Sequence, residues 1–306
     1  MALHPEIARV LATLPAPPPG PLDPVAMRAD EESHVAPLEE RLPLHRVEDT
    51  TAPTAYGDVP VRVYTPTEQP VPGTLVYLHG GAFFLGSLET HDHVARALAQ
   101  ATGMQVVSVG YRRAPEAAYP AGLEDCYGVV RWAGERLEPG ATLAVVGDSS
   151  GGTFVAAVTA MAKDDGWDRI THQVLYYPSL DLDFPDDIER GTRYASLRDN
   201  AVGYGLETAG LKPFNAFYLE SGADPADPLV SPIKRADLSG LPPALVVTAE
   251  LDPLRDEGEL YAERLRAAGV DATTSRYDGA GHGFVQHFSW LPDYHRVFAE
   301  TAEFLR

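Results

Sequence analysis

Four short apolar runs between residues 74 and 177 form the strongest pattern in the chain. They are Thr74–Leu78, Gln105–Val109, Leu143–Val146 and Gln173–Tyr177. Each is apolar without alternation, which is typical of a strand buried on both faces of a parallel sheet. An earlier run, Val59–Tyr64, alternates and predicts a strand with Val59, Val61 and Val63 on one face.

Helical patterns separate these strands, around His93–Gln100, Leu123–Leu137 and Gly152–Lys163. Alternation of strand and helix predicts an α/β fold with right-handed crossovers and helices on both faces of the sheet. The alternation of strand and helix stops at about residues 181–241, where one helix is expected near Pro213–Glu220. It then resumes with a strand at Pro243–Thr248, a helix at Arg255–Ala268, a strand at Thr273–Tyr277 and a C-terminal amphipathic helix.

The first 45 residues do not show the alternation of strand and helix patterns. A short helical pattern through Ile7 and Leu14 is followed by a stiff, proline-rich break at 15–21 and a polar run, expected to be helical, from Val25 to about Leu42. We therefore predict an α/β core formed by residues 46–180 and 241–306. Residues 1–45 and part of the insertion 181–240 are predicted to form a helical cap over the carboxyl ends of the strands.

Composition and charge exclude several kinds of site and partner. The chain has 306 residues, one of which is a cysteine, so Cys126 has no intramolecular partner and no cysteine zinc site exists. The formal net charge of −20 argues against nucleic acid and anionic membrane partners. No apolar stretch approaches the roughly 20 residues of a membrane span, and the start lacks the basic region of a signal peptide, so a cytoplasmic location is expected. Whether the acidic surface reflects salt adaptation stays open.

The segment Val146–Gly152 carries the central chemical motif. Its letters, Val-Gly-Asp-Ser-Ser-Gly-Gly, fit the G-x-S-x-G turn that presents a nucleophilic serine between a strand and a helix. The motif makes Ser149 the candidate nucleophile and places Ser150 in the helix that follows. Alone the pattern is weak, because a glycine- and serine-containing turn also caps ordinary helices.

A second glycine-rich segment, His79-Gly80-Gly81-Ala82-Phe83, directly follows a predicted strand. Backbone N–H groups of such a loop stabilise the oxyanion of acyl transfer. We expect an oxyanion hole formed by the Gly80–Ala82 segment and Ser150, with N–H donors from Gly81, Ala82 and Ser150.

The remaining partners of a serine nucleophile are an acid and then a histidine. Asp252 follows the strand that ends at Thr248, and His282 lies between glycines after the next strand. Both are expected at the same sheet edge as Ser149, so we assign Asp252 as the orienting acid and His282 as the general base. The competing acids are Glu250, Asp256 and Glu257, of which the last two are expected to begin a helix.

Six motifs, between about residues 45 and 290, give the chain a family resemblance. They are His79–Phe83, Tyr111–Glu116 with Tyr119-Pro-Ala and Leu123–Asp125, Gly147–Gly152, Asp227–Pro232, Asp252–Asp256 and Gly281–Phe284. Together they resemble the bacterial hormone-sensitive-lipase-like carboxylesterases (family IV) of the α/β-hydrolase superfamily. Two positions depart from that family's pattern, since Ala82 replaces a glycine of the oxyanion loop and Ser150 replaces an alanine after the nucleophile.

This resemblance implies an α/β-hydrolase fold, with a mostly parallel eight-stranded sheet and a helical cap. It also implies a Ser-Asp-His triad, a small-molecule ester of short to medium acyl chain as substrate, and no metal or cofactor. A homodimer is left open, without a residue-level argument for it. Two other functions also stay open: an amidase, peptidase or lactone hydrolase with the same triad, and a non-catalytic ligand-binding protein on this fold.

Overall fold

The computed structural model describes residues 2–14, 20–185 and 193–306. Its centre is one eight-stranded sheet in the order β1-β2-β4-β3-β5-β6-β7-β8. The strands are β1 (Arg46–Thr54), β2 (Gly57–Thr65), β3 (Val71–Leu78), β4 (Met104–Val109), β5 (Thr142–Asp148), β6 (His172–Tyr176), β7 (Ala244–Leu251) and β8 (Ala272–Gly281). β1 pairs with β2 and β2 with β4 antiparallel, and the other neighbours are parallel. The predicted α/β class and the mostly parallel sheet are confirmed.

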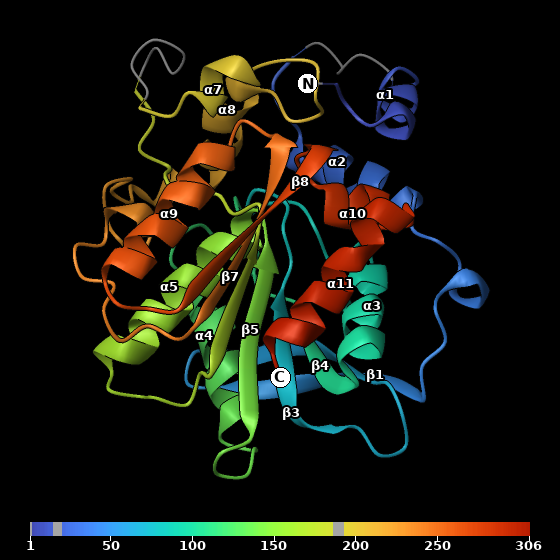
Figure 1. The fold of residues 1–306 in the computed structure, drawn as a ribbon, viewed down its shortest axis with the longest axis vertical. Coiled ribbons are helices and arrows are strands. Elements are labelled where there is room, and N and C mark those ends of the chain that lie inside the picture. Colours follow the sequence, from blue (N-terminus) through green and yellow to red (C-terminus); the bar gives the residue numbers. More distant parts are fainter. Residues whose placement is uncertain (1, 15–19, 186–192) are drawn as a thin grey trace.

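Helices cover both faces of this sheet (Figure 1). On one face lie α4 (Ala121–Gly134), α5 (Ser150–Asp164) and α9 (Arg255–Ala267), whose apolar side chains belong to one core cluster. On the other lie α3 (Asp92–Thr102), the short α10 (Phe284–Phe288) and α11 (Pro292–Phe304), with a second cluster. A parallel sheet must bury both faces, and these two clusters are how this chain does so.

The strand β1 is absent from the sequence interpretation. It is an edge strand in which only Ala52 is buried, so no apolar pattern marks it. Its backbone pairs with β2 along its whole length, from Arg46 opposite Thr65 to Thr54 opposite Gly57. Backbone hydrogen bonds to β2 define this strand. They leave no pattern in its side chains.

Four further helices lie at the end of the molecule toward which β5, β7 and β8 point (Figure 1). They are α1 (Pro5–Leu11), α2 (Pro24–Ser33), α7 (Ser196–Asp199) and α8 (Thr208–Tyr218), and we call them the cap helices. The helix expected from Val25 to about Leu42 is wrong beyond Ser33, where α2 ends, and a 3₁₀ turn at Leu38–Glu40 follows. Pro37 explains the difference, because it lacks an N–H and disfavours helical geometry in the residue before it.

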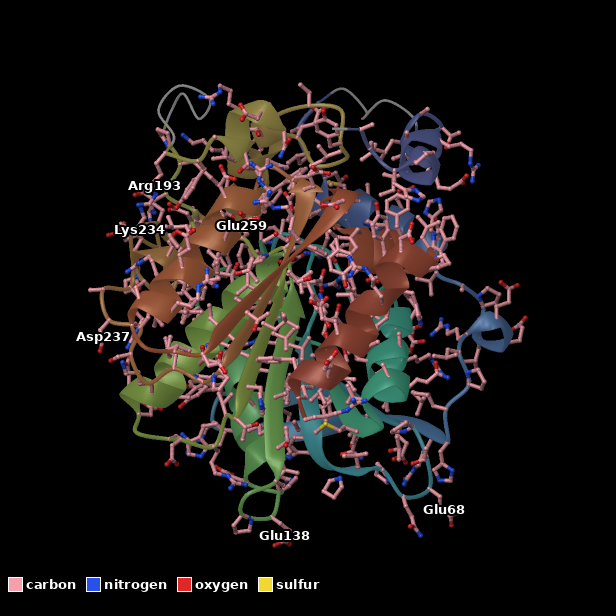
Figure 2. The ribbon with its side chains drawn as sticks, in the orientation of Figure 1. Glu68, Glu138, Arg193, Lys234, Asp237 and Glu259 are labelled. Atoms are coloured by element: carbon pink, nitrogen blue, oxygen red, sulfur yellow. The ribbon has the colours of Figure 1, made fainter. Side chains whose placement is uncertain are left out.

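Most of the charged side chains labelled in Figure 2 lie at the outline of the molecule. Glu68 and Glu138 lie in loops that precede β3 and β5, at the end of the sheet opposite the cap helices. Arg193 and Lys234 lie on the same side of the molecule, and both pair with the buried Asp181. In the described part of the chain, no helix is both long and apolar enough to span a bilayer.

Candidate active site

A sharp turn between β5 and α5 presents Ser149. Its backbone has φ 53° and ψ −119°, which L residues rarely adopt. The turn is tight because a Cβ at Gly147 would lie 2.5 Å from the Gly151 carbonyl oxygen, and a Cβ at Gly151 would collide with the Leu78 carbonyl oxygen. The two motif glycines therefore allow α5 and β3 to approach closely while Ser149 projects from the end of the sheet. Ser150 is the first residue of α5, as the motif predicts.

The structure brings Ser149, His282 and Asp252 together at the carboxyl ends of β5, β8 and β7. His282 Nε2 lies 2.9 Å from Ser149 Oγ, and His282 Nδ1 lies 2.7 Å from Asp252 Oδ2. Asp252 is fully buried, and its other oxygen accepts the backbone N–H of Leu254 at 2.8 Å. This line of hydrogen bonds can orient one imidazole nitrogen toward the hydroxyl while the other faces a fixed carboxylate.

The competing acids have other partners. Glu250 accepts the backbone N–H of Gly279, Asp256 accepts that of Ser196, and Glu257 accepts that of Leu180. Among the described residues, Asp252 is the carboxylate that lies within hydrogen-bond distance of His282, and the three competitors do not lie within it. Geometry thus separates residues that are only a few positions apart along the chain.

The glycine-rich loop after β3 lies beside Ser149. Among the described residues no acceptor is hydrogen-bonded to the backbone N–H groups of Gly81, Ala82 and Ser150. Ala82 has φ 49° and Phe83 has φ 68°, so the loop keeps a left-handed conformation where alanine replaces the expected glycine. These three amides can serve an oxyanion.

The inclusion of Gly80 in the predicted oxyanion hole needs correction. Its N–H donates to Asp148 Oδ1 at 2.9 Å and is not available to a substrate. Asp148 also accepts the Tyr77 hydroxyl at 2.6 Å. Burial opposes ionisation of Asp148, but the neighbouring His91 and these hydrogen bonds lower the pKa of its carboxyl below the ordinary value. A buried carboxylate therefore ties the loop to the nucleophile turn, a role that the sequence motif does not reveal.

A cavity of about 590 Å³ opens over Ser149 and His282. Its size lies within the range of small-ligand sites, roughly 300–1,000 Å³. Side chains of α1 and α8 line it together with Leu14, which follows α1, and the glycine-rich loop; they include Ile7, Leu11, Phe83, Leu211 and Phe214. Tyr204 lines the cavity too, whereas Phe284 packs against Tyr177 and Tyr277.

Residues of the cap helices α1, α2 and α8 line this cavity. Ile7, Val10 and Leu11 recur on one face of α1, which also fits an ordinary packing helix. His287 lines the cavity as well, and burial lowers its pKa to about 4, so this imidazole is neutral near neutral pH.

Glu257 lies behind the acid of this site and provides a stability test. Burial is the main cause that raises the pKa of its carboxyl, and the nearby Asp181 and Asp252 raise it further. The folded protein thus keeps a proton that the unfolded chain loses above pH 4.5. Since the unfolded state then binds fewer protons, the free energy of unfolding falls as pH rises through this window.

We expect Glu257→Gln to remove this pH-dependent loss, because glutamine cannot ionise and still accepts the Leu180 N–H. Over each pH unit in which only the folded state keeps the proton, the free energy of unfolding of the wild type falls by about 1.4 kcal/mol. Urea unfolding of both proteins at pH 5 and pH 7 should show the variant gaining stability relative to wild type as the pH rises. An equal difference at the two pH values would contradict a protonated Glu257.

Comparisons with known proteins identify the family of this chain. The family described as alpha/beta hydrolase fold matches residues 75–286. The carboxylesterase NlhH of Mycobacterium tuberculosis is 42% identical over 267 residues, covering 83% of this chain and 80% of its own. The chain belongs to the α/β-hydrolase family. Within it, the chain groups with the carboxylesterases, which confirms the hormone-sensitive-lipase-like resemblance.

Solved α/β-hydrolases extend the likeness to almost the whole chain. A hyperthermophilic esterase from the archaeon Pyrobaculum calidifontis superposes with a TM-score of 0.86 at 38% identity, covering 99% of this chain and 97% of its own. Among the relatives matched by sequence, an arylesterase of Saccharolobus solfataricus is 37% identical, covering 74% of this chain and 73% of its own. The cap helices therefore fall within the region that this α/β-hydrolase shares with a solved esterase.

Proposed function

We propose that this carboxylesterase cleaves esters of short to medium acyl chain with Ser149 as nucleophile, His282 as general base and Asp252 as orienting acid. The observation that carries the proposal is the continuous line from Asp252 to His282 to Ser149, at 2.7 and 2.9 Å, beside three unused backbone amides. A serine hydroxyl needs an adjacent base near neutral pH, and the imidazole lies where that base is required.

In the proposed reaction, His282 Nε2 takes the hydroxyl proton as Ser149 Oγ attacks the ester carbonyl. The carbonyl oxygen becomes an oxyanion that the N–H groups of Gly81, Ala82 and Ser150 stabilise. Protonated His282 then gives its proton to the leaving alcohol, which leaves an acyl-Ser149 ester. Water repeats the two proton transfers and releases the carboxylic acid and the free hydroxyl.

Substrate class follows from the cavity. Its wall beyond the reacting groups is mostly apolar, with Leu11, Phe83, Leu211 and Phe214 among its side chains, and its volume is about 590 Å³. Each methylene that enters such a pocket contributes roughly 1–3 kcal/mol to binding. A chain that exceeds the space gains nothing more, so we expect a preference for acyl groups that fit between α1 and α8.

The test is a series of p-nitrophenyl esters from acetate to palmitate, with p-nitroanilides of matched acyl groups. We expect kcat/KM to peak at acetate to octanoate and to fall by more than about tenfold, or 1.4 kcal/mol, by palmitate. Hydrolysis of the anilides at rates comparable with the esters would favour the amidase alternative. A fluorophosphonate should label Ser149 in the intact protein, and a protein that neither reacts nor turns over esters would be a ligand-binding protein.

A further inference from the structure

The loop from His79 to Gly86 does not hold its shape by local preference. Gly81, Ala82 and Phe83 all have positive φ, of 120°, 49° and 68°. For residues with a side chain this region costs roughly 1–2 kcal/mol each. Such a conformation persists where surrounding contacts determine it, so the contacts around this loop decide where its amides point.

One set of contacts comes from the core segment Tyr111–Glu116, a motif that the reaction does not use. The Tyr111 hydroxyl donates to the His79 carbonyl oxygen at 2.9 Å, and the Ala114 N–H donates to that of Phe83 at 3.0 Å. The Arg113 guanidinium donates to the Gly86 carbonyl oxygen at 2.5 Å. This motif therefore braces the loop from the core side.

The second set comes from the cap helix α2. Arg28 Nε donates to the Phe84 carbonyl oxygen at 2.6 Å, and its Nη2 donates to that of Ala114 at 2.5 Å. One turn later on the same helix, Glu31 Oε2 accepts the Gly86 N–H at 2.9 Å. Arg28 and Glu31 of α2 thus hold the backbone of Phe84 and Gly86, in the half of the oxyanion loop that lies farther from β3 along the chain.

Polar contacts of this kind matter more for holding α2 in place than they would in a helix with a buried face, because none of the residues of α2 is buried. The helix lacks the apolar face that fastens an ordinary surface helix. Glu116 binds the Arg28 guanidinium through both carboxylate oxygens at 2.8 Å, and this contact lowers the pKa of Glu116 to about 2. Arg28 is therefore fixed in orientation between the exposed carboxylate of Glu116 and the Phe84 carbonyl oxygen of the loop.

We propose that Arg28 and Glu31 are positioning residues for the oxyanion hole, so that docking of α2 sets the geometry of the amides that receive the reaction's negative charge. This inference rests on the proposed esterase function. It gives the cap helix α2, whose Glu31 also lines the substrate cavity, a part in setting the geometry of the oxyanion hole. Neither residue contacts the reacting atoms, and both act through the loop backbone.

The experiment compares kcat and KM of Arg28→Ala, Glu31→Ala and Glu31→Gln in the full-length protein with p-nitrophenyl butyrate. Misplaced oxyanion donors weaken the transition state, so we expect Arg28→Ala to lower kcat by about 10- to 100-fold while KM changes less than about threefold. Glutamine keeps an acceptor for the Gly86 N–H, so Glu31→Gln should recover most of the activity lost in Glu31→Ala. Glu32→Ala is the matched control, because Glu32 is the exposed next residue of the same helix.

Chemical rescue adds a readout that a general loss of stability would not give. Millimolar guanidinium should restore part of kcat to Arg28→Ala and leave Glu32→Ala unchanged. A purely structural or wall-forming role for Arg28 predicts a raised KM, or a lowered unfolding midpoint, with kcat within twofold of Glu32→Ala, and that result would overturn the proposal. A wild-type protein without esterase turnover would instead remove the proposed function itself.

Discussion

Replacing Ser149 with alanine is expected to lower kcat for p-nitrophenyl butyrate by about a million-fold, the size of effect seen when a serine hydrolase loses its nucleophile. The hydroxyl lies 2.9 Å from His282 Nε2, and no covalent acyl intermediate can form without it. The fold should be unaffected, because the change removes one oxygen from the turn. Steady-state kinetics with urea unfolding as a companion measurement would check both statements.

The neighbouring hydroxyl supplies the matched control. Ser150 Oγ accepts the Phe83 N–H at 3.2 Å, and its own contribution to the oxyanion is a backbone amide that alanine retains. We therefore expect Ser150→Ala to lose only a few-fold in kcat and to remain labelled by a fluorophosphonate. The reverse pattern, with Ser149→Ala active and Ser150→Ala inactive, would move the nucleophile by one residue.

The second large effect is expected for Asp252→Asn, at about 10⁴-fold in kcat. Asp252 is fully buried against His282 Nδ1, and an amide there can face that nitrogen with its NH₂ group. The imidazole would then carry its proton on Nε2 and could not accept one from Ser149. If Asp252→Asn shows this loss of activity but keeps the stability of the wild type, the effect comes from the imidazole tautomer with its proton on Nε2.

Glu250→Gln tests the same assignment from the other side. Glu250 Oε2 accepts the Gly279 N–H at 2.8 Å, and glutamine preserves an acceptor for that bond. We expect activity within a few-fold of wild type. If Glu250→Gln matched Asp252→Asn in its loss, the acid of the triad would have to be assigned again.

Much of this architecture could be read from local patterns. The buried strands β3 to β7 are apolar on both faces, so their positions follow from composition alone. The catalytic candidates were also readable, since Ser149, Asp252 and His282 each lie directly after a strand. Parallel strands deliver such residues to one edge of the sheet.

The sequence interpretation missed or misplaced other features. The edge strand β1 is mostly exposed and polar, and only pairing with β2 makes it a strand. The end of α2 at Ser33 depends on Pro37, a signal present in the chain but outweighed in our interpretation by the helical composition of the residues around it. The boundaries of the cap, at residues 45 and 181–240, stay predictions.

The amino-acid sequence by itself determined the fold class and the turn that presents Ser149, and it offered Asp252 and His282 as candidate partners, because each depends on short-range patterns and on the direction of parallel strands. Only the tertiary structure decided which amides are free for an oxyanion. The Gly80 N–H is taken by Asp148, and Arg28 and Glu31 reach the same loop from a helix more than fifty residues earlier. The reason is physical: a hydrogen-bond donor is available or occupied according to what lies within 3 Å of it in space, and residues distant in the chain supply those atoms.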